Sequence, residues 1–359
     1  MSAVTNQPEL GDSRATDERG PDLLEVEGLT KLFPVRRGIF GRKVGDVHAV
    51  DGVNLTVDTA RTVGLVGESG SGKSTVARLI SRLIEPTSGT IQFEGEDLAS
   101  LNQKEMLPAR RRIQMVFQDP YSSFDPTKRL VESVAEPLKA HTTLNRSGRE
   151  RRVHELFVRT GLSEEHASRY PSELSGGQLQ RAAIARALTV ETRLLLLDEP
   201  VSALDVSTQA QVINLLQDLQ EELGLAYLFI AHDLSIVRHV SHRIAVMYLG
   251  RIVEEGAAEE IYDSPTHPYT EALLSAVPEP NPARQRARER IILSGDVPSP
   301  LNPPSGCSFR TRCPYAMAIC EEVEPPAFRT QHGTTVHCHL HTTGPQLRGE
   351  SVTVLRTHR

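Results

Sequence analysis

Several features that define other classes of protein are missing from this sequence. No apolar run approaches the ~20 residues that a bilayer-spanning helix needs, and residues 1–21 are polar and lack the apolar centre of a secretory signal. The formal net charge of -6 argues against a general nucleic-acid binder, because such proteins present a basic surface to phosphates. No internal repeat is evident. These absences predict a cytoplasmic protein whose membrane contacts come through a partner.

A glycine-rich loop at residues 67–74 has the spacing of a phosphate-binding loop, G-x-x-x-x-G-K-S. Its glycines let successive backbone N–H groups curl around phosphates, while Lys73 reaches the terminal phosphates and Ser74 offers an oxygen to Mg²⁺. The loop lies between an apolar segment at 62–66, which predicts a strand, and apolar residues at helical spacing over 76–84. The predicted nucleotide-binding residues here are Gly67, Ser69, Gly70, Ser71, Gly72, Lys73, Ser74 and Thr75.

An acidic motif follows a second predicted strand. Residues 194–197 are four leucines, a short apolar run typical of a buried parallel strand. Asp198 at its end would hold Mg²⁺, and Glu199 would polarise a water for in-line attack on the γ-phosphate. The alternative interpretation makes these two carboxylates a helix cap before Pro200, but the phosphate loop independently supports the catalytic one.

Between these motifs lies a Ser-Gly-Gly-Gln turn, formed by Ser175, Gly176, Gly177 and Gln178. Such a turn at the start of a helix presents N–H donors and the positive end of the helix dipole to an anion. Alone, it would suit a plain capping box equally well. In this order, the three motifs resemble those of the ATP-binding subunits of ABC transporters.

That resemblance implies an α/β fold: a P-loop ABC ATPase core with a mixed sheet and flanking helices, and a helical subdomain. In the family two nucleotide-binding domains close face to face, and the P-loop of one and the Ser-Gly-Gly-Gln signature of the other enclose each ATP. Gln118 matches the family residue that touches Mg²⁺ and the attacking water, and His232 the one that contacts the γ-phosphate. Residues 202–205 match the loop that crosses the dimer interface, and Phe33 is the candidate for stacking on adenine. The implied Mg²⁺ residues are therefore Ser74, Gln118 and Asp198.

The composition along the chain predicts its organisation. The expected parts are a disordered tail at 1–22, a nucleotide-binding domain at 23–262 with a helical subdomain at about 102–170, an irregular extension at 263–342, and a tail at 343–359. A basic insertion at 36–43 is interpreted as a solvated hairpin, with contact to lipid headgroups or to the transporter as the alternative.

The proline-rich extension narrows the resemblance. Residues 267–270 (His-Pro-Tyr-Thr) and 306–310 (Gly-Cys-Ser-Phe-Arg) resemble the extension found in ATPases of oligopeptide, dipeptide and nickel importers. Residues 114–123 and 246–250 look closest to the second of the two ATPase subunits that such importers carry. The resemblance implies ATP hydrolysis that drives peptide import at the cytoplasmic face of the membrane.

The implied partners are a paired ATPase, most simply in a heterodimer, two membrane permeases and an extracytoplasmic solute-binding protein. Nickel or another small solute is the alternative cargo. A soluble ABC ATPase that acts on DNA or ribosomes is disfavoured, because the chain has a single nucleotide-binding domain and no long coiled-coil insert.

The four cysteines, Cys307, Cys313, Cys320 and Cys338, all lie in the extension. Disulfides are disfavoured in a reducing compartment, and the spacing lacks the C-x-x-C pairs of common zinc sites. Four thiolates on an irregular loop can converge on a [4Fe-4S] cluster, which the resemblance also favours. Ordinary thiols are one alternative, and zinc, with His332, His337 or His339 as substitute ligands, is another.

Overall fold

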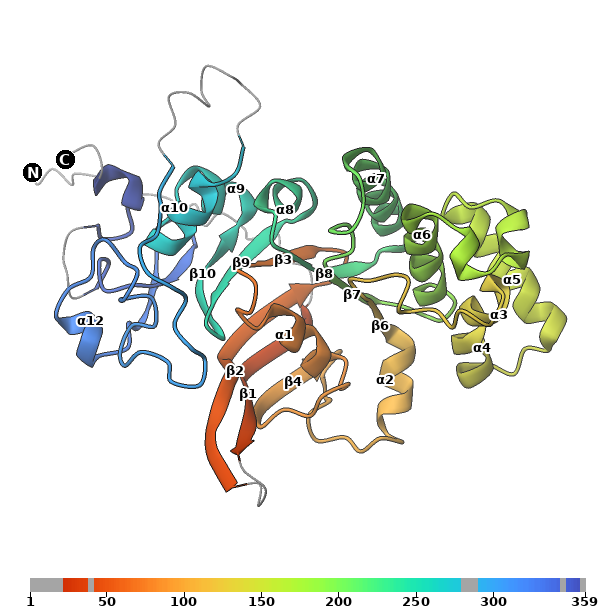
Figure 1. Cartoon of the computed structure of the whole chain (residues 1–359), viewed down its shortest axis with the longest axis horizontal. Coiled ribbons are helices and arrows are strands. Elements are labelled where there is room, and N and C mark those ends of the chain that lie inside the picture. The colour runs from red at the N-terminus through yellow and green to blue at the C-terminus, as the bar shows by residue number, and fades with distance from the viewer. Residues whose placement is uncertain (1–21, 38–41, 279–289, 343–346, 356–359) are drawn as a thin grey trace, which may run out of the picture.

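The computed structural model describes residues 22–37, 42–278, 290–342 and 347–355 (Figure 1). Within these ranges the strands are β1 (Asp22–Arg37), β2 (Arg42–Asp58), β3 (Thr62–Val66), β4 (Ser88–Phe93), β5 (Glu96–Asp97), β6 (Ile113–Val116), β7 (Leu194–Asp198), β8 (Ala226–Ala231), β9 (Arg243–Tyr248), β10 (Arg251–Ala257), β11 (Ala327–Arg329) and β12 (Thr335–His337). The helices are α1 (Lys73–Ile80), α2 (Met106–Arg112), α3 (Leu130–Val134), α4 (Glu136–His141), α5 (Arg146–Arg159), α6 (Gly176–Ala187), α7 (Val206–Leu223), α8 (Leu234–Val240), α9 (Ala258–Asp263), α10 (Pro268–Ser275) and α12 (Ile319–Glu322), with the short 3-10 helices η1 (Glu164–Ser168), η2 (Pro171–Glu173) and η3 (Val352–Leu355).

Two sheets form the body of the molecule. An antiparallel sheet has the strand order β2-β1-β4-β5, and a larger sheet has the order β11-β12-β10-β9-β3-β8-β7-β6. In the larger sheet β9, β3, β8, β7 and β6 are parallel, and β10, β12 and β11 continue it antiparallel. The predicted α/β class with a mixed sheet and flanking helices is confirmed.

The central strands are apolar throughout because both of their faces are covered. Every residue of β3, β7 and β8 is buried. In β7 the side chains alternate, so that Leu194 and Leu196 join the apolar core shared with α1 and the small sheet. Leu195 and Leu197 join the opposite core, shared with helices α6 to α8. Because the leucines are buried on both faces of the sheet, the position of Asp198 at the end of β7 is fixed.

The helical subdomain, residues 130–173, comprises α3, α4, α5, η1 and η2 and lies at one end of the molecule against α6 (Figure 1). The predicted segment 102–170 starts earlier than this subdomain because β6 belongs to the larger sheet. At the other end lies the extension, a term we use for the described residues from 263 to 355. No helix in the described ranges is both long and apolar enough to cross a membrane.

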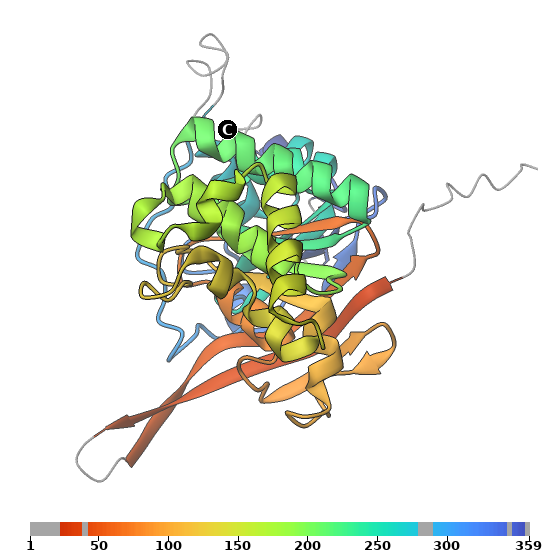
Figure 2. The ribbon, with the colours of Figure 1, turned by 90° about the vertical axis from the view of Figure 1, so that its right-hand side faces the viewer.

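The extension adds strands to the larger sheet. Strand β12 pairs with β10, with Val336 opposite Glu254. Residues 347–355, predicted as part of a tail, instead pack into the extension: Leu347 and Val352 are buried, and Val352 N donates to the carbonyl of Pro265. The hairpin of β1 and β2 projects from the body (Figure 2). The tip of the basic insertion, 38–41, and the tail at 1–21 lie outside the described residues.

Candidate active site

The glycine loop joins β3 to α1, as predicted, and its shape requires glycine at two positions. Gly67 and Gly72 have φ angles of 155° and 109°, where other residues are strained. A Cβ at Gly67 would lie 2.1 Å from the carbonyl oxygen of Met247, and one at Gly72 would lie 2.2 Å from that of Ala49. The backbones of β9 and β2 thus lie too close to the loop to leave space for a side chain at these two positions.

Lys73 lies inside this curl. Its Nζ donates to the carbonyl oxygens of Gly67 and Glu68 at 2.8 and 2.9 Å, and the residue is only 5% exposed. Burial lowers the pKa of Lys73, whereas the charges of Glu199, Asp198 and Glu68 oppose that shift. The ammonium is held where the loop's N–H groups can surround phosphate oxygens.

Two of the three predicted Mg²⁺ residues are in contact. Ser74 Oγ, at the start of α1, donates to Asp198 Oδ1 at 2.7 Å. Burial raises the pKa of Asp198, and the hydrogen bond from Ser74 works in the opposite direction. A hydroxyl and a carboxylate beside a phosphate loop are a donor set that fits Mg²⁺.

The three predicted catalytic residues meet at one carboxylate oxygen. Glu199 Oε2 accepts a hydrogen bond from Gln118 Nε2 at 2.9 Å and lies 3.2 Å from His232 Nδ1. Glu199 has a left-handed backbone, with φ of 49°, and its N–H donates to the carbonyl of Ile230 at 3.0 Å. Such a conformation costs a residue other than glycine roughly 1–3 kcal/mol, and it is found most often at functional sites.

These residues open onto one cleft of about 510 Å³. Its lining is Val47, Ala49, Ser69, Gly70, Gly72, Lys73, Ser74, Thr75, Gln118, Glu199, His232 and Pro300. Val47, Ala49 and Pro300 were not expected from the sequence. Pro300 is brought in because its carbonyl accepts the N–H of His48 at 2.9 Å, a contact that no local sequence pattern indicates.

Phe33 and the Ser-Gly-Gly-Gln signature do not line this cleft. Phe33 is 36% exposed and lies opposite Val47 in the ladder of β1 and β2. Ser175 caps α6: its Oγ accepts the N–H of Gln178 at 3.3 Å, and its own N–H donates to Gln178 Oε1 at 2.9 Å. Among the described residues that line the cleft, neither Phe33 nor the signature residues occur. The roles of both therefore stay predictions.

The four cysteines gather within the extension. The N–H of Cys307 donates to the carbonyl of Cys320 at 2.9 Å. Burial raises the pKa of Cys338 and, to about 12, that of Cys313, and the neighbouring cysteines add to both shifts. No group of three or more His, Cys, Asp or Glu side chains within the described ranges is placed to hold a single metal ion. Neither zinc nor an iron-sulfur cluster finds support in this arrangement.

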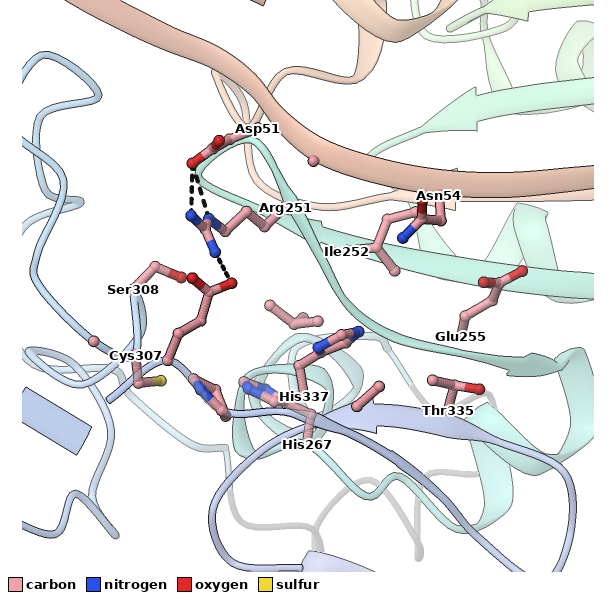
Figure 3. A pocket seen from close by; sticks show the side chains of 16 residues that line it. Asp51, Asn54, Arg251, Ile252, Glu255, His267, Cys307, Ser308, Thr335 and His337 are labelled. Carbon is pink, nitrogen blue, oxygen red and sulfur yellow. Dashed lines mark hydrogen bonds and ion pairs between the residues drawn. The ribbon is translucent and has the colours of Figure 1, made fainter. Parts of the chain in front are cut away.

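A second cavity of about 330 Å³ lies where β10 meets the extension (Figure 3). Arg251 spans one side of it, between Asp51 of β2 and Glu324 of the extension. Cys307 and His337 line the cavity as well. The sequence did not indicate this cavity, because its walls come from β2, β10 and several separate stretches of the extension.

Comparisons with known proteins agree with this geometry. Residues 50–202 match the family "ABC transporter", and residues 253–320 match "Oligopeptide/dipeptide transporter, C-terminal region". The chain is 52% identical over 320 residues to the oligopeptide transport ATP-binding protein AppF of Bacillus subtilis, covering 89% of this chain and 97% of that protein. It is 46% identical over 303 residues to the dipeptide transport ATP-binding protein DppF of Escherichia coli, covering 84% of this chain and 90% of that one.

Among solved structures, the chain resembles the ATP-binding cassette MJ0796 in a dimeric post-hydrolysis state bound to ADP and Pi. The TM-score is 0.59 at 31% identity, over 66% of this chain and 98% of the cassette. It also resembles cbiO1 of Clostridium perfringens, with a TM-score of 0.58 at 29% identity, over 67% of this chain and 90% of that one. About a third of the chain thus lies beyond the part shared with these cassettes.

Proposed function

Because the chain belongs to the ABC transporter family, among the oligopeptide and dipeptide transport ATP-binding proteins, we propose that it hydrolyses ATP to drive peptide import. One observation carries the catalytic part of this proposal: Gln118 and His232 both meet Glu199, beside the contact of Ser74 with Asp198. The chain works at the cytoplasmic face of the membrane, as a subunit of a transporter.

The predicted site residues divide the work of phosphoryl transfer. Lys73 and the loop N–H groups bind the phosphates. Ser74, Gln118 and Asp198 would hold Mg²⁺, which would neutralise charge on the phosphates. Glu199 orients and polarises the attacking water. Gln118 and His232 keep the Glu199 carboxylate in place, and His232 would contact the γ-phosphate.

The site is completed by a second ATPase. The signature at Ser175–Gln178 opens α6 and, in this proposal, faces the nucleotide of the partner subunit, while the partner's signature closes over Lys73. The paired ATPase forms a heterodimer with this chain, and two permeases and an extracytoplasmic binding protein complete the importer. The isolated chain is therefore expected to hydrolyse ATP weakly, with a rate per molecule that rises when the partner ATPase is added.

The test is Glu199→Gln in the assembled importer. The amide keeps the size of the side chain but cannot act as a base, so ATP turnover should fall roughly 10²- to 10⁴-fold while ATP binding persists. Turnover is measured by phosphate release, and binding by equilibrium titration. Turnover close to that of the wild type would remove Glu199 from its role. A full hydrolysis rate in dilute monomer, independent of protein concentration, would contradict the two-subunit site.

We further infer that the four cysteines hold a structural [4Fe-4S] cluster. A four-iron cluster takes one thiolate at each of four corners, so its ligands need not converge on one point as they must around a single ion. Metal binding would deprotonate thiols whose pKa burial raises. Anaerobically purified protein should be brown and contain iron and sulfide, and Cys313→Ser should lose both. Colourless protein without iron would leave ordinary thiols.

A further inference from the structure

The glycine loop is held from outside by side chains of the extension. The N–H of Glu68, the second residue of the loop, donates to the Tyr269 hydroxyl at 2.8 Å. The Glu68 carboxylate accepts two hydrogen bonds from the Arg312 guanidinium, at 2.8 and 3.1 Å. Its carbonyl oxygen accepts from Lys73 Nζ at 2.9 Å. One loop residue thus connects the extension with the phosphate-binding lysine.

Packing fixes the two side chains that reach Glu68. Tyr269, Tyr248 and Phe309 are at most 1% exposed, and their ring centroids lie 4.7 to 5.4 Å apart. The guanidinium of Arg312 lies 6.0 Å from the centre of the Tyr248 ring, and its side chain is 9% exposed. Because the Arg312 guanidinium is held in place, it can form both hydrogen bonds only with one orientation of the Glu68 carboxylate.

The His-Pro-Tyr-Thr segment is itself anchored to β10. The buried carboxylate of Glu254 accepts hydrogen bonds from the N–H groups of Thr266 and His267, at 2.6 and 3.0 Å. His267 Nδ1 then caps α10 by accepting the N–H of Tyr269 at 3.0 Å. This chain of contacts sets the direction in which the Tyr269 side chain leaves α10.

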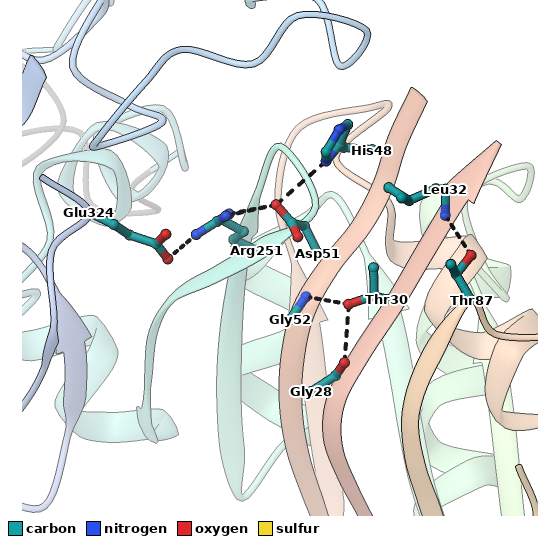
Figure 4. A network of polar contacts seen from close by, with 9 residues as sticks. All are labelled: Gly28, Thr30, Leu32, His48, Asp51, Gly52, Thr87, Arg251 and Glu324. Atoms are coloured by element: carbon teal, nitrogen blue, oxygen red, sulfur yellow. Dashed lines mark hydrogen bonds and ion pairs between the residues drawn. The ribbon is translucent and has the colours of Figure 1, made fainter. Parts of the chain in front are cut away.

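Further contacts hold the rest of the extension to the core. Arg251 donates to Asp51 at 3.0 and 2.8 Å and pairs with Glu324, as Figure 4 shows. Strand β12 adds to β10, and the N–H of His48 binds the carbonyl of Pro300. Arg312 therefore approaches the glycine loop from a segment that is fixed at several other points.

The contact between Arg312 and Glu68 affects the charge that bound ATP meets at the loop. ATP brings several negative charges to the loop, and an unpaired Glu68 carboxylate would repel them and compete for Lys73. We propose that Arg312 and Tyr269 are positioning residues of the nucleotide site, acting on ATP through Glu68. Arg312 holds the carboxylate away from the phosphates and balances its charge, and Tyr269 fixes the backbone of the loop. The proposal rests on the placement of the ATP phosphates on the glycine loop.

The test is equilibrium titration of the full-length chain with ATP and Mg²⁺. Arg312→Met should weaken ATP affinity about tenfold, because it frees a carboxylate beside the phosphates. With Glu68→Gln in the background, the same substitution should change affinity less than about threefold, since no carboxylate remains to be balanced. Equal losses in both backgrounds, or affinity within about twofold of the wild type for the single variant, would overturn the role of Arg312.

Arg310→Met is the matched control. Arg310 lies in the same segment, but it binds the Ser305 carbonyl and Glu321 instead of the glycine loop. Its loss should leave ATP affinity unchanged. If Arg310→Met weakened ATP binding as much as Arg312→Met, the effect would come from a loosened extension and the proposal would fail.

Tyr269→Phe tests the other contact and remains informative if Arg312→Met does not fold. It keeps the buried ring and removes only the acceptor of the Glu68 N–H, so affinity should fall about threefold to tenfold with little change in Tm. Unchanged affinity would rule Tyr269 out as a positioning residue.

Lys73→Ala distinguishes a failure of the proposed phosphate site from a failure of the positioning role. If it binds ATP normally, the placement of the phosphates is wrong. If it loses ATP while Arg312→Met and Tyr269→Phe keep it, only the positioning role is wrong.

Discussion

The helical subdomain and the extension are attached to the same core by different means. Phe157 of the helical subdomain and Leu179 of α6 lie in one continuous apolar cluster with Leu195 of the larger sheet. The extension has a small apolar cluster of its own and also reaches the larger cluster through Tyr269, Leu274 and Phe309, but its contacts with the glycine loop are polar: Arg312 and Tyr269 with Glu68. A region attached through many apolar contacts tolerates the loss of one, whereas each of the two contacts between the extension and the glycine loop can be removed by a single substitution.

The largest expected effect compares one buried ring from each region. Phe309→Ala and Phe157→Ala each remove a ring that is at most 1% exposed and should cost about 3–5 kcal/mol in the free energy of unfolding. Only Phe309 packs against Tyr269 and Tyr248, so only its loss should also weaken ATP binding. Urea denaturation and ATP titration measure the two effects. Equal loss of ATP affinity in both variants would erase the distinction between the regions.

Next in size is Glu254→Gln, which targets the anchor of the extension. In the wild type, one oxygen of Glu254 accepts a hydrogen bond from Thr266 and the other from His267. The amide replaces one of these oxygens by an NH₂ group, so that two donors face each other, and this should destabilise the protein by about 1–3 kcal/mol. Glu259→Gln, on the exposed face of α9, is the control and should stay within about 0.5 kcal/mol. Thermal unfolding of both variants gives the comparison, and equal midpoints would mean that Glu254 is no anchor.

A smaller effect should appear only in acid. Burial lowers the pKa of His267 from 6.5 to about 3, with the charges of His341 and His337 acting in the same direction. Between pH 6.5 and about 3, His267 therefore binds a proton in the unfolded chain but not in the folded chain. The contribution of His267 to stability is complete above pH 6.5 and is lost as pH falls toward 3. His267→Asn keeps an N-cap acceptor and should flatten this slope, whereas exposed His239→Asn should not. Identical slopes in all three proteins would contradict the assignment.

The smallest effect is expected at a surface ion pair between the helical subdomain and α7. Arg159 pairs with Glu222 at the surface, where both side chains remain in contact with water. Because exposed ion pairs contribute little to stability, Arg159→Met should leave the unfolding midpoint and ATP affinity unchanged. A clear loss of stability would show that this region depends on charged pairs as well.

Local patterns were sufficient to predict the centre of the site. Gly67, Lys73 and Ser74 lie in one short motif, and the four leucines before Asp198 are typical of a strand covered on both faces. Both Ser74 and Asp198 are predicted to hold the same Mg²⁺, which places them near each other. Gln118 and His232 are assigned to the site only through the family resemblance, and no local pattern predicts their contacts with Glu199, because three separate strands deliver these residues.

The parts that could not be predicted depend on contacts across the whole chain. Arg312 is separated from Glu68 by 244 positions, and nothing in its short irregular segment has a period that indicates a direction. Pro300 enters the cleft through a single backbone hydrogen bond to His48. Residues 343–359 are predicted as a tail, yet Leu347 and Val352 of this segment are buried.

The distance between Glu68 and Arg312 along the chain also orders events on the ribosome. At roughly 5–20 residues per second, about 12–50 s pass between the synthesis of Glu68 and that of its partner 244 residues later. During this interval the Glu68 carboxylate of the emerging domain lacks Arg312 as its partner. If Arg312 acts on ATP through Glu68 as proposed, a nascent chain binds ATP less tightly until Arg312 has been synthesised.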